Sequence, residues 1–213
     1  GGKVQIPDGS FVLQAGDSIS VTAPPRALRK FFEAAGAYQK PVKNVLILGG
    51  SRIAVYLTML LESTGVDVTI IESSHNRCQQ LAELLQMADV VCADGTDTTV
   101  LAQSGLQDAD GFVALTNIDE ENIILSMYAE KLGVEKVVSK INNEKFTDLL
   151  RDVFPDTTLS PKNLVAERIE GYVRGLDHAS DESTIEALYY LGNQDVMATE
   201  FVVGAKAACV GKT

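Results

Sequence analysis

The sequence has no tryptophan, only two histidines and only three cysteines in 213 residues. Neither His75 nor His178 stands in a ligand-like spacing such as H-x-x-x-H, which argues against a zinc centre. Cys78, Cys92 and Cys209 are odd in number and lack the paired spacing of a metal site. We therefore expect reduced thiols and a cytoplasmic protein, with a redox-sensing cysteine as the alternative.

Positive charge is also scarce, with 18 lysines and arginines against 29 acidic residues and a net charge of −11. No basic patch stands out, so we expect no nucleic acid partner and no adsorption to an anionic membrane. No apolar run reaches the roughly 18 residues that a membrane span needs, so we expect no direct membrane insertion.

Short apolar runs alternate with helical patterns through residues 43–160. This alternation implies a parallel sheet, and runs that are apolar on both faces imply that helices cover both sides of it. We predict a Rossmann-like, doubly wound α/β fold for residues 41–160. The expected strands are Val45–Leu48, Val68–Ile71, Val90–Ala93, Gly111–Leu115, Val137–Ile141 and Thr158–Leu159. The expected helices cover 52–63, 75–87, 97–104, 120–132 and 144–152.

The first 40 residues have a different character. Residues 3–9 and 13–21 predict short strands, and residues 26–35 predict a short amphipathic helix. These pieces are too small for an independent domain. We interpret residues 1–40 as the end of a small domain.

The residues after the predicted sheet form an arm and the start of another small domain. The apolar stripe of a helix expected at 161–176 packs on its own sheet or forms a dimer contact. We assign residues 161–180 to this helical arm and a linker, and residues 181–213 to the beginning of the second small domain.

The turn after the first strand has features of a phosphate-binding loop. Gly49 fills the first place of a G-x-G-x-x-G turn, Ser51 the second and Ala54 the third. Gly50 restores some of the backbone freedom lost at Ser51, whose hydroxyl can donate to a phosphate. Arg52 adds a cation at the same turn. A helix N-terminus there offers free amides to an anion, so the turn predicts phosphate binding.

The second strand ends in a carboxylate, Glu72, near the expected offset of about 20 residues from the turn. Glu72 can accept hydrogen bonds from both ribose hydroxyls and would repel a 2′-phosphate. It can alternatively cap the helix that follows. The layout predicts binding of NAD(H), or of ATP or ADP, rather than NADP(H); an empty crevice is the alternative.

Polar residues follow the third and fourth strands at the same predicted edge of the sheet. Asp94 and Gly95 follow the third strand and should border the adenosine. Thr116 follows the fourth strand, and it serves the phosphates or ribose or caps the next helix. Asn122 lies one turn further on and is a candidate to face the crevice.

Two charged residues stand near the predicted crevice. Asp119, in the first turn of the helix around 120–132, is expected to complement the helix dipole. Lys140 ends the fifth strand, where it reaches toward a phosphate, pairs with an acid such as Asp94, or is solvated.

No nucleophile–base pair emerges, and we find no substrate-holding domain of catalytic size. A dehydrogenase needs such a domain to position its substrate, so we predict that the protein is not an enzyme. The alternatives are an NAD-dependent oxidoreductase fragment, a methyltransferase that uses the same crevice, and a ligand-free assembly scaffold.

Together these residues resemble the RCK (regulator of potassium conductance) family, in particular the TrkA-type regulators of potassium uptake. The resemblance is fullest over residues 43–176. Its motifs are Val45–Ala54, Ile70–Glu72, Asp94–Asp97, Ala114–Asn122 and Lys140–Asn142. In addition, 6–9 with 16–17, and 200–203, resemble parts of the family's small RCK-C domain.

The resemblance implies the second Rossmann unit (RCK-N, or TrkA-N) of a tandem protein, flanked by partial RCK-C (TrkA-C) domains at 1–40 and 181–213. It implies a cytosolic regulator that gates a TrkH- or KtrB-type potassium channel at the inner face of the membrane. The regulator would be a homo-oligomer, either a dimer or a ring, that binds NAD(H), ATP or ADP. By position, Arg52 and Ile53 would touch phosphates and Thr96 the adenosine side. The full predicted cofactor-binding set is Gly49, Gly50, Ser51, Arg52, Ile53, Glu72, Asp94, Gly95, Thr96, Thr116 and Lys140.

Overall fold

The chain divides into two compact units, one of them Lys40–Leu164 and the other made of Gly1–Gln39 with Val165–Thr213. The computed structural model describes residues 6, 9–17, 19, 21–36, 40–143, 145–146, 158–178, 183–191, 196–203 and 210–211. The predicted Rossmann range 41–160 lies within the first unit.

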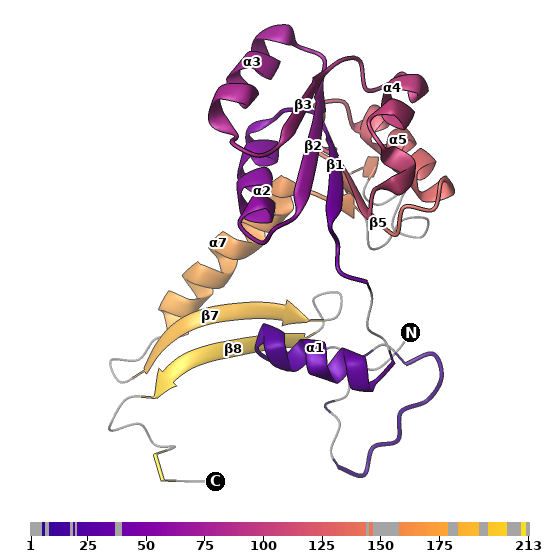
Figure 1. Ribbon diagram of the computed structural model, residues 1–213. Helices are drawn as coiled ribbons and strands as arrows, with labels where there is room; N and C mark the ends of the chain where they lie inside the picture. The colour runs from indigo at the N-terminus through magenta and orange to yellow at the C-terminus, as the bar shows by residue number, and fades with distance from the viewer. Residues whose placement is uncertain are drawn as a thin grey trace. The chain divides into compact units, whose positions relative to one another are not determined.

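The Lys40–Leu164 unit holds a six-stranded sheet with α2 and α3 on one side and α4 and α5 on the other (Figure 1). Its strands are β1 (Asn44–Leu48), β2 (Asp67–Glu72), β3 (Asp89–Cys92), β4 (Gly111–Ala114), β5 (Lys136–Lys140) and β6 (Thr158–Leu159). Its helices are α2 (Arg52–Glu62), α3 (His75–Leu84), α4 (Thr98–Gln103), the short η1 (Leu106–Asp108) and α5 (Asp119–Lys131).

The strands lie in the order β3-β2-β1-β4-β5-β6, and all neighbouring pairs are parallel. This confirms the predicted Rossmann-like, doubly wound sheet. The chain passes from β1 outward to β2 and β3, and then returns to β4 on the other side of β1. Sheets of this kind hold ligands beyond the carboxyl ends of the strands at that switch point.

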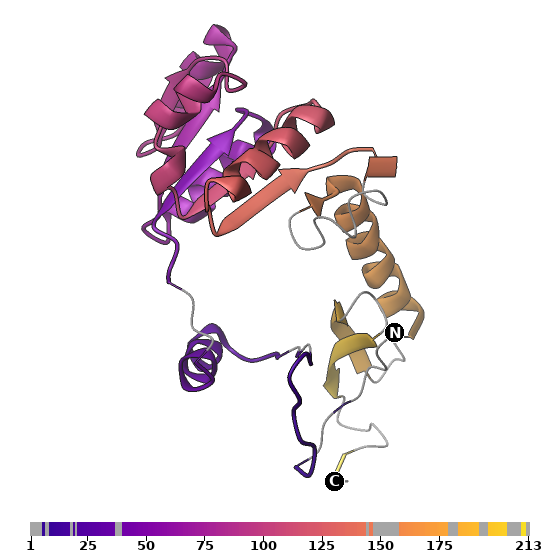
Figure 2. The ribbon, with the colours of Figure 1, turned by 90° about the vertical axis from the view of Figure 1, so that its right-hand side faces the viewer.

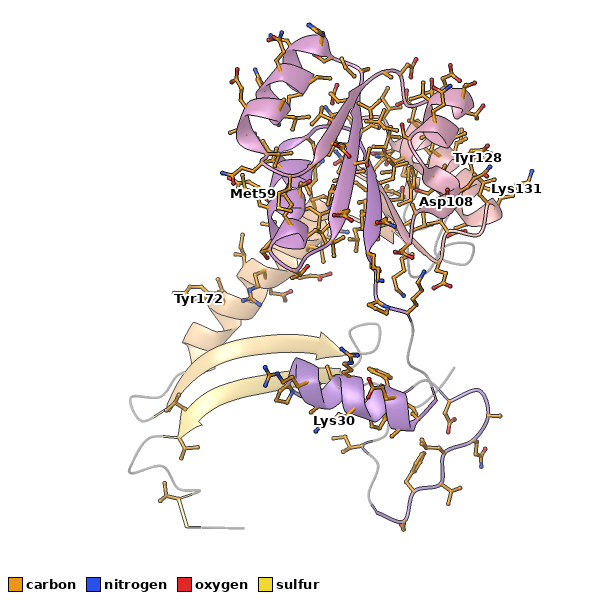
Figure 3. All side chains as sticks on the ribbon, viewed as in Figure 1. Lys30, Met59, Asp108, Tyr128, Lys131 and Tyr172 are labelled. Carbon is orange, nitrogen blue, oxygen red and sulfur yellow. The ribbon has the colours of Figure 1, made fainter. Side chains whose placement is uncertain are left out.

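Alternate residues of β1 face two separate cores. Val45 and Ile47 pack with residues of α2 and α3, whereas Leu46 and Leu48 pack with residues of α4 and α5. Side chains fill the space on both sides of the sheet (Figure 3), and α5 lies along its β4–β5 part (Figure 2). Each fully buried aliphatic side chain contributes about 1.5–3 kcal/mol, so these two cores stabilise the strand order.

One carboxylate links the amino ends of two neighbouring strands. Asp110, just before β4, accepts hydrogen bonds from the backbone amides of Lys43 at 2.8 Å and Asn44 at 3.1 Å. These amides, with the nearby Lys40 ammonium, hold the pKa of Asp110 below its ordinary value. The start of β1 is thereby tied to the start of β4.

The predicted element bounds need two corrections, and one predicted helix cannot be compared. The third helix ends at Leu84 rather than 87, because Leu85 is extended and buried in the core. The short strands expected in 3–9 and 13–21 are absent from the described residues of those ranges, since an extended segment without a pairing partner forms no ladder. The helix expected at 144–152 lies almost wholly outside the described residues.

The second unit contributes a helix and a hairpin, and it shares a long helix with the first unit. Helix α1 is Pro25–Ala34, and α7, Pro161–His178, spans the boundary between the units. Strands β7 (Ser183–Leu191) and β8 (Val196–Val203) pair antiparallel. The predicted helical arm at 161–176 is therefore confirmed as a helix.

Candidate functional site

The glycine-rich turn brings the backbone of β1 against the end of β4. Gly49 has a φ of +93°, a conformation that side chains rarely adopt. A Cβ there would lie 2.9 Å from the amide nitrogen of Thr116, so the approach leaves no room for a side chain. The Gly49 amide donates to the Ile71 carbonyl at 2.8 Å, which also ties the turn to β2.

Ser51 is the N-cap of α2 and not merely a poor substitute for glycine. Its hydroxyl oxygen accepts from the Ala54 amide at 3.3 Å, and its carbonyl accepts from the Val55 amide at 3.2 Å. The amides of Ser51, Arg52 and Ile53 precede this first helical bond, so helix geometry leaves them without an intrahelical acceptor. These amides are the donors that the predicted phosphate-binding turn requires.

The Glu72 carboxylate joins two elements of the site. One oxygen accepts from the Gly50 amide at 2.7 Å, and the other accepts from the Ser74 amide at 2.8 Å. Ser74 is the N-cap of α3, so Glu72 supports the start of the following helix and also holds the turn. Each carboxylate oxygen retains capacity for another donor, such as a ribose hydroxyl.

Arg77, on the first turns of α3, is a residue that the sequence reasoning missed. Its Nε donates to the Gly50 carbonyl at 2.6 Å, and its Nη1 donates to the Gln80 side chain at 2.9 Å. The guanidinium therefore lies beside the turn, whose Gly50 amide is held by Glu72. A cation one helical turn after the N-cap Ser74 was the available signal, since that position points back toward the helix start.

The loop after β3 is held by its own side chains. One Asp94 oxygen accepts from the Thr96 amide at 2.9 Å and from the Thr96 hydroxyl at 2.8 Å. These two hydrogen bonds stabilise the ionised form and lower the pKa of Asp94. The carboxylate is exposed and charged at neutral pH, and Asp97 then caps α4 through the Thr99 amide at 2.8 Å.

Asn122, a candidate to face the crevice, does not line it. It is fully buried, and its amide oxygen accepts from the Thr116 amide at 3.0 Å and hydroxyl at 2.8 Å. Its amide nitrogen donates to the carbonyls of Thr116 at 3.2 Å and Lys140 at 2.9 Å. Asn122 thus joins the ends of β4 and β5 and positions Thr116 from behind.

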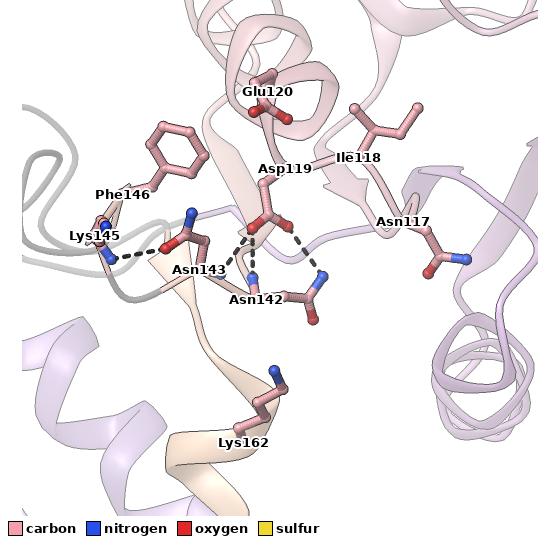
Figure 4. A pocket seen from close by; sticks show the side chains of 9 residues that line it. All are labelled: Asn117, Ile118, Asp119, Glu120, Asn142, Asn143, Lys145, Phe146 and Lys162. Carbon is pink, nitrogen blue, oxygen red and sulfur yellow. Dashed lines mark hydrogen bonds between the residues drawn. The ribbon is translucent and has the colours of Figure 1, made fainter.

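Asp119 stands in the first turn of α5, as expected, and both Asp119 and Lys140 have specific hydrogen-bond partners. Asp119 accepts from the backbone amides of Asn142 at 2.9 Å and Asn143 at 2.8 Å, so it binds a loop rather than capping α5 (Figure 4). Lys140 is buried rather than solvated, and its ammonium donates to the Asn117 side chain at 3.3 Å. Burial lowers the pKa of Lys140, and the nearby Asp119 charge opposes that shift.

A crevice of about 620 Å³ lies at the carboxyl ends of β1, β2, β3 and β4. Eight residues of the predicted set line it: Gly49, Gly50, Ser51, Glu72, Asp94, Gly95, Thr96 and Thr116. Arg77 and Glu121 line it as well. Three predicted residues, Arg52, Ile53 and Lys140, are not among its lining residues, and the side chains of Arg52 and Ile53 are exposed.

A second hollow of about 680 Å³ adjoins the crevice and shares Asn117 and Ile118 with it. Asp119, Asn142 and Asn143 form its floor through their mutual hydrogen bonds (Figure 4). Its remaining lining residues are Glu120, Lys145, Phe146 and Lys162.

The described residues contain neither a membrane-spanning helix nor a metal-binding cluster. No helix there has the length and apolar character needed to cross a bilayer. No cluster of three or more histidine, cysteine or acidic side chains there is arranged to hold a metal ion.

The sequence is similar to proteins of potassium uptake. It is 31% identical to the Trk system potassium uptake protein TrkA of Halomonas elongata over 201 residues, covering 92% of this chain and 44% of that protein. It is 27% identical to the Trk system potassium uptake protein trkA homolog 1 of Methanosarcina mazei over 211 residues, covering 99% of this chain and 50% of that protein. The chain thus spans about half the length of these relatives or less.

Solved structures share the fold of the sheet unit. The GsuK RCK domain superposes with a TM-score of 0.54 at 22% identity, covering 68% of this chain and 31% of that one. The AMP-bound Kef C-terminal domain of Shewanella denitrificans superposes with a TM-score of 0.52 at 18% identity, covering 65% and 84%. The GsuK channel bound to NAD gives a TM-score of 0.55 at 22% identity, covering 73% and 28%.

The TrkA-N domain family model matches residues 45–161, which include all of the six-stranded sheet except Asn44 and all of the crevice turn. With the parallel sheet and the similarity to potassium uptake proteins, this match shows that the chain belongs to the TrkA-N family of RCK-type regulators.

Proposed function

We propose that this chain is part of a cytoplasmic regulatory subunit that binds NAD(H) or an adenine nucleotide and gates a TrkH- or KtrB-type potassium channel. The observation that carries the proposal is the crevice itself. Its glycine turn, the free amide end of α2 and the Glu72 carboxylate stand at one switch point of the sheet. The free amides suit a phosphate, and the carboxylate suits the hydroxyls of a ribose.

The ligand we favour is NAD(H), with ATP or ADP as further candidates. Glu72 offers acceptors to a ribose diol and a negative charge that disfavours a 2′-phosphate. Related folds have been solved with NAD and with AMP, so an adenosine moiety is common to the candidates. Among the predicted residues, the amides at Ser51–Ile53 would hold phosphates, and Asp94, Gly95 and Thr96 would border the adenosine.

A regulatory role is supported over an enzymatic one. Serines and carboxylates are among the described residues that line the crevice, but no histidine that could activate a serine is among them. The relatives are named for potassium uptake. The oxidoreductase alternative would require turnover of NADH by the purified protein.

We assign residues 1–40 and 181–213 to partial RCK-C domains, and the sheet unit to the second Rossmann unit of a tandem protein. The protein would act as a homo-oligomer. The surface proposed for the contact is the exposed apolar stripe of α7, made of Leu164, Val165, Ile169, Tyr172 and Val173. Burying such a stripe against a second copy would remove apolar area from water.

Gating requires that the nucleotide bind one state of the regulator more tightly than another. The ligand would draw the turn at Gly49 toward the loops at Asp94 and Thr116, because these segments line the same crevice. The resulting shift of the sheet would pass along α7 to a neighbouring subunit and from there to the channel.

Thermal denaturation with a nucleotide series tests the proposal. NADH, NAD, NADPH, ATP, ADP, AMP and S-adenosylmethionine are titrated separately into the full chain. A ligand that binds only the folded state raises the melting temperature as its concentration passes its Kd. No shift with any of them would favour a ligand-free scaffold, and a shift with S-adenosylmethionine alone would favour a methyltransferase.

Two arginine variants locate the phosphate contact. Arg77→Ala removes a cation that contacts the turn in the structure. Arg52→Ala removes a cation that adjoins the turn in the sequence. A larger loss of affinity in Arg77→Ala would place the phosphates over the turn and α3. In the full-length protein, unchanged coupling of nucleotide to potassium flux in both variants would show that this crevice is not the sensor.

A further inference from the structure

Two cysteines from different elements lie at Glu72, one of the residues that line the crevice. Cys92 ends β3 directly beside Glu72 of β2, since the two are register partners in the sheet. Cys78, on α3, donates its thiol hydrogen to the Glu72 carbonyl at 3.2 Å. Both cysteines are thus placed at Glu72, one through the sheet register and the other through its thiol, and Cys92 is near enough to Cys78 to raise its pKa.

The two thiols differ in their surroundings. Cys92 is exposed, and its sulfur lies 3.8 Å from Nδ1 of His75, the first residue of α3. Cys78 is buried, and its burial, the adjacent Cys92 and the nearby Glu72 raise its pKa to about 12. Cys92 is therefore the accessible nucleophile with a neighbouring imidazole, and Cys78 is a protected second thiol.

We propose that Cys78 and Cys92 are a thiol modification site in which a peroxide closes a disulfide and thereby weakens nucleotide binding in the adjoining crevice. The disulfide stands on the cysteine geometry alone, whereas the effect on binding rests on the proposed function. Reduced thiols are the resting state in the cytosol, so the modification would be transient.

The chemistry balances with hydrogen peroxide as the oxidant. The Cys92 thiolate, with its proton taken by His75 or water, attacks one peroxide oxygen. The O–O bond breaks, the other oxygen leaves as water, and Cys92 becomes a sulfenic acid. The Cys78 sulfur then attacks the Cys92 sulfur, the S–O bond breaks, and a second water leaves with the Cys78 proton. Two thiols and one peroxide thus yield one disulfide and two waters.

The disulfide would reach the crevice through Glu72 and Arg77. A disulfide sulfur has no hydrogen, so Cys78 could no longer donate to the Glu72 carbonyl. The new bond would also join the first turns of α3 to the end of β3. Arg77 precedes Cys78 in α3, and both Arg77 and Glu72 contact the glycine turn. A shift of α3 would therefore disturb the side chains that hold the turn.

Peptide mapping tests the disulfide without reference to any nucleotide. The reduced full chain is treated with hydrogen peroxide, its remaining thiols are alkylated, and it is cleaved after glutamate, which separates the two cysteines at Glu83. We expect linked Cys78 and Cys92 peptides that separate on reduction. In Cys78→Ala, we expect Cys92 to accumulate as a sulfenic acid that dimedone traps, while Cys209→Ser is a control with unchanged linkage.

NADH titration of the reduced and oxidised protein tests the effect on the crevice. We expect oxidation to raise the Kd about tenfold, the equivalent of losing one or two hydrogen bonds. Cys92→Ser should bind NADH as the reduced parent does, and peroxide should not change its Kd. Restoration of affinity by dithiothreitol would exclude irreversible damage.

Distinct results would overturn each part. Bonds to Cys209, or a sulfinic acid on Cys92 without a linked peptide, would overturn the disulfide. A linked pair with an unchanged Kd would overturn the coupling. If the reduced protein binds none of the nucleotides, the proposed function and the coupling both fail, and the peptide map still decides the disulfide.

Discussion

Carboxylates and amides follow the strands on both sides of the switch point, but the two sides differ in how these side chains are used. On the β2–β3 side, Glu72 and Asp94 line an open crevice and retain free acceptor capacity. On the β4–β5 side, Asp119 and Asn122 are buried and bound to backbone groups. Residue type, strand-end position and backbone partners are alike, since Glu72 and Asp94 also accept from backbone amides, so burial decides which side chains keep acceptors open to a ligand.

Among the variants that test this comparison, Asn122→Leu is expected to have the largest effect on stability. The change would leave the Thr116 amide and Lys140 carbonyl buried without partners, at about 1–3 kcal/mol for each group. Urea denaturation should show a loss of about 3 kcal/mol in the free energy of unfolding. Glu120→Gln, an exposed change on the same helix, should stay within about 0.5 kcal/mol. A similar loss in both variants would refute the internal role of Asn122.

Gly49→Ala should have the next largest effect. Its backbone conformation alone costs about 1–2 kcal/mol in an alanine, and the contact with the Thr116 amide adds strain. Gly105→Ala is the matched control, because Gly105 has a φ of +83° but nothing within 4 Å of its added Cβ. We expect unfolding free energy to fall in both variants, but NADH affinity to fall only in Gly49→Ala. Equal losses of affinity would show that the close approach is unimportant.

Glu72→Gln should affect binding more than folding. The amide keeps one acceptor for the Gly50 or Ser74 amide and removes the charge, so we expect about 1 kcal/mol less stability and about tenfold weaker NADH binding. NADPH should lose less affinity than NADH, because the repulsion of a 2′-phosphate is removed. Calorimetric titration of both nucleotides measures this, with Glu121→Gln controlling for charge in the same crevice. A parallel loss for both nucleotides would argue against a ribose contact.

The smallest expected effect is the pH dependence of Asp94 and Asp110. Both have pKa values lowered from 3.8 in the fold, so each stabilises the protein above that pH and loses its contribution as pH falls through the folded pKa. Asp94→Asn and Asp110→Asn should each flatten the decline of melting temperature below about pH 4. Only Asp94→Asn should change nucleotide affinity at neutral pH, because Asp110 lies at the opposite edge of the sheet. Equal effects on affinity would place the ligand elsewhere.

Much of the sheet unit follows from the sequence because its signals are local. Apolar runs of strand length, the glycine turn after β1 and the acid at Glu72 depend only on residues near one another in the chain. They predicted the six strands and their parallel pairing and, together with the family resemblance, eight residues that line the crevice. Where a local signal competed with packing, packing prevailed, as at Leu85, whose burial ends α3 early.

The partners of the polar side chains were decided only in the tertiary structure. Lys140 and Asp119 end or begin elements in the way that solvated or capping residues do, yet folding places one beside Asn117 and the other over the 142–143 loop amides. Arg77 reaches Gly50 only because α3 returns to the turn. Periodicity determines which face of an element is apolar, whereas a hydrogen bond between segments distant in sequence depends on distances that only the packed sheet sets.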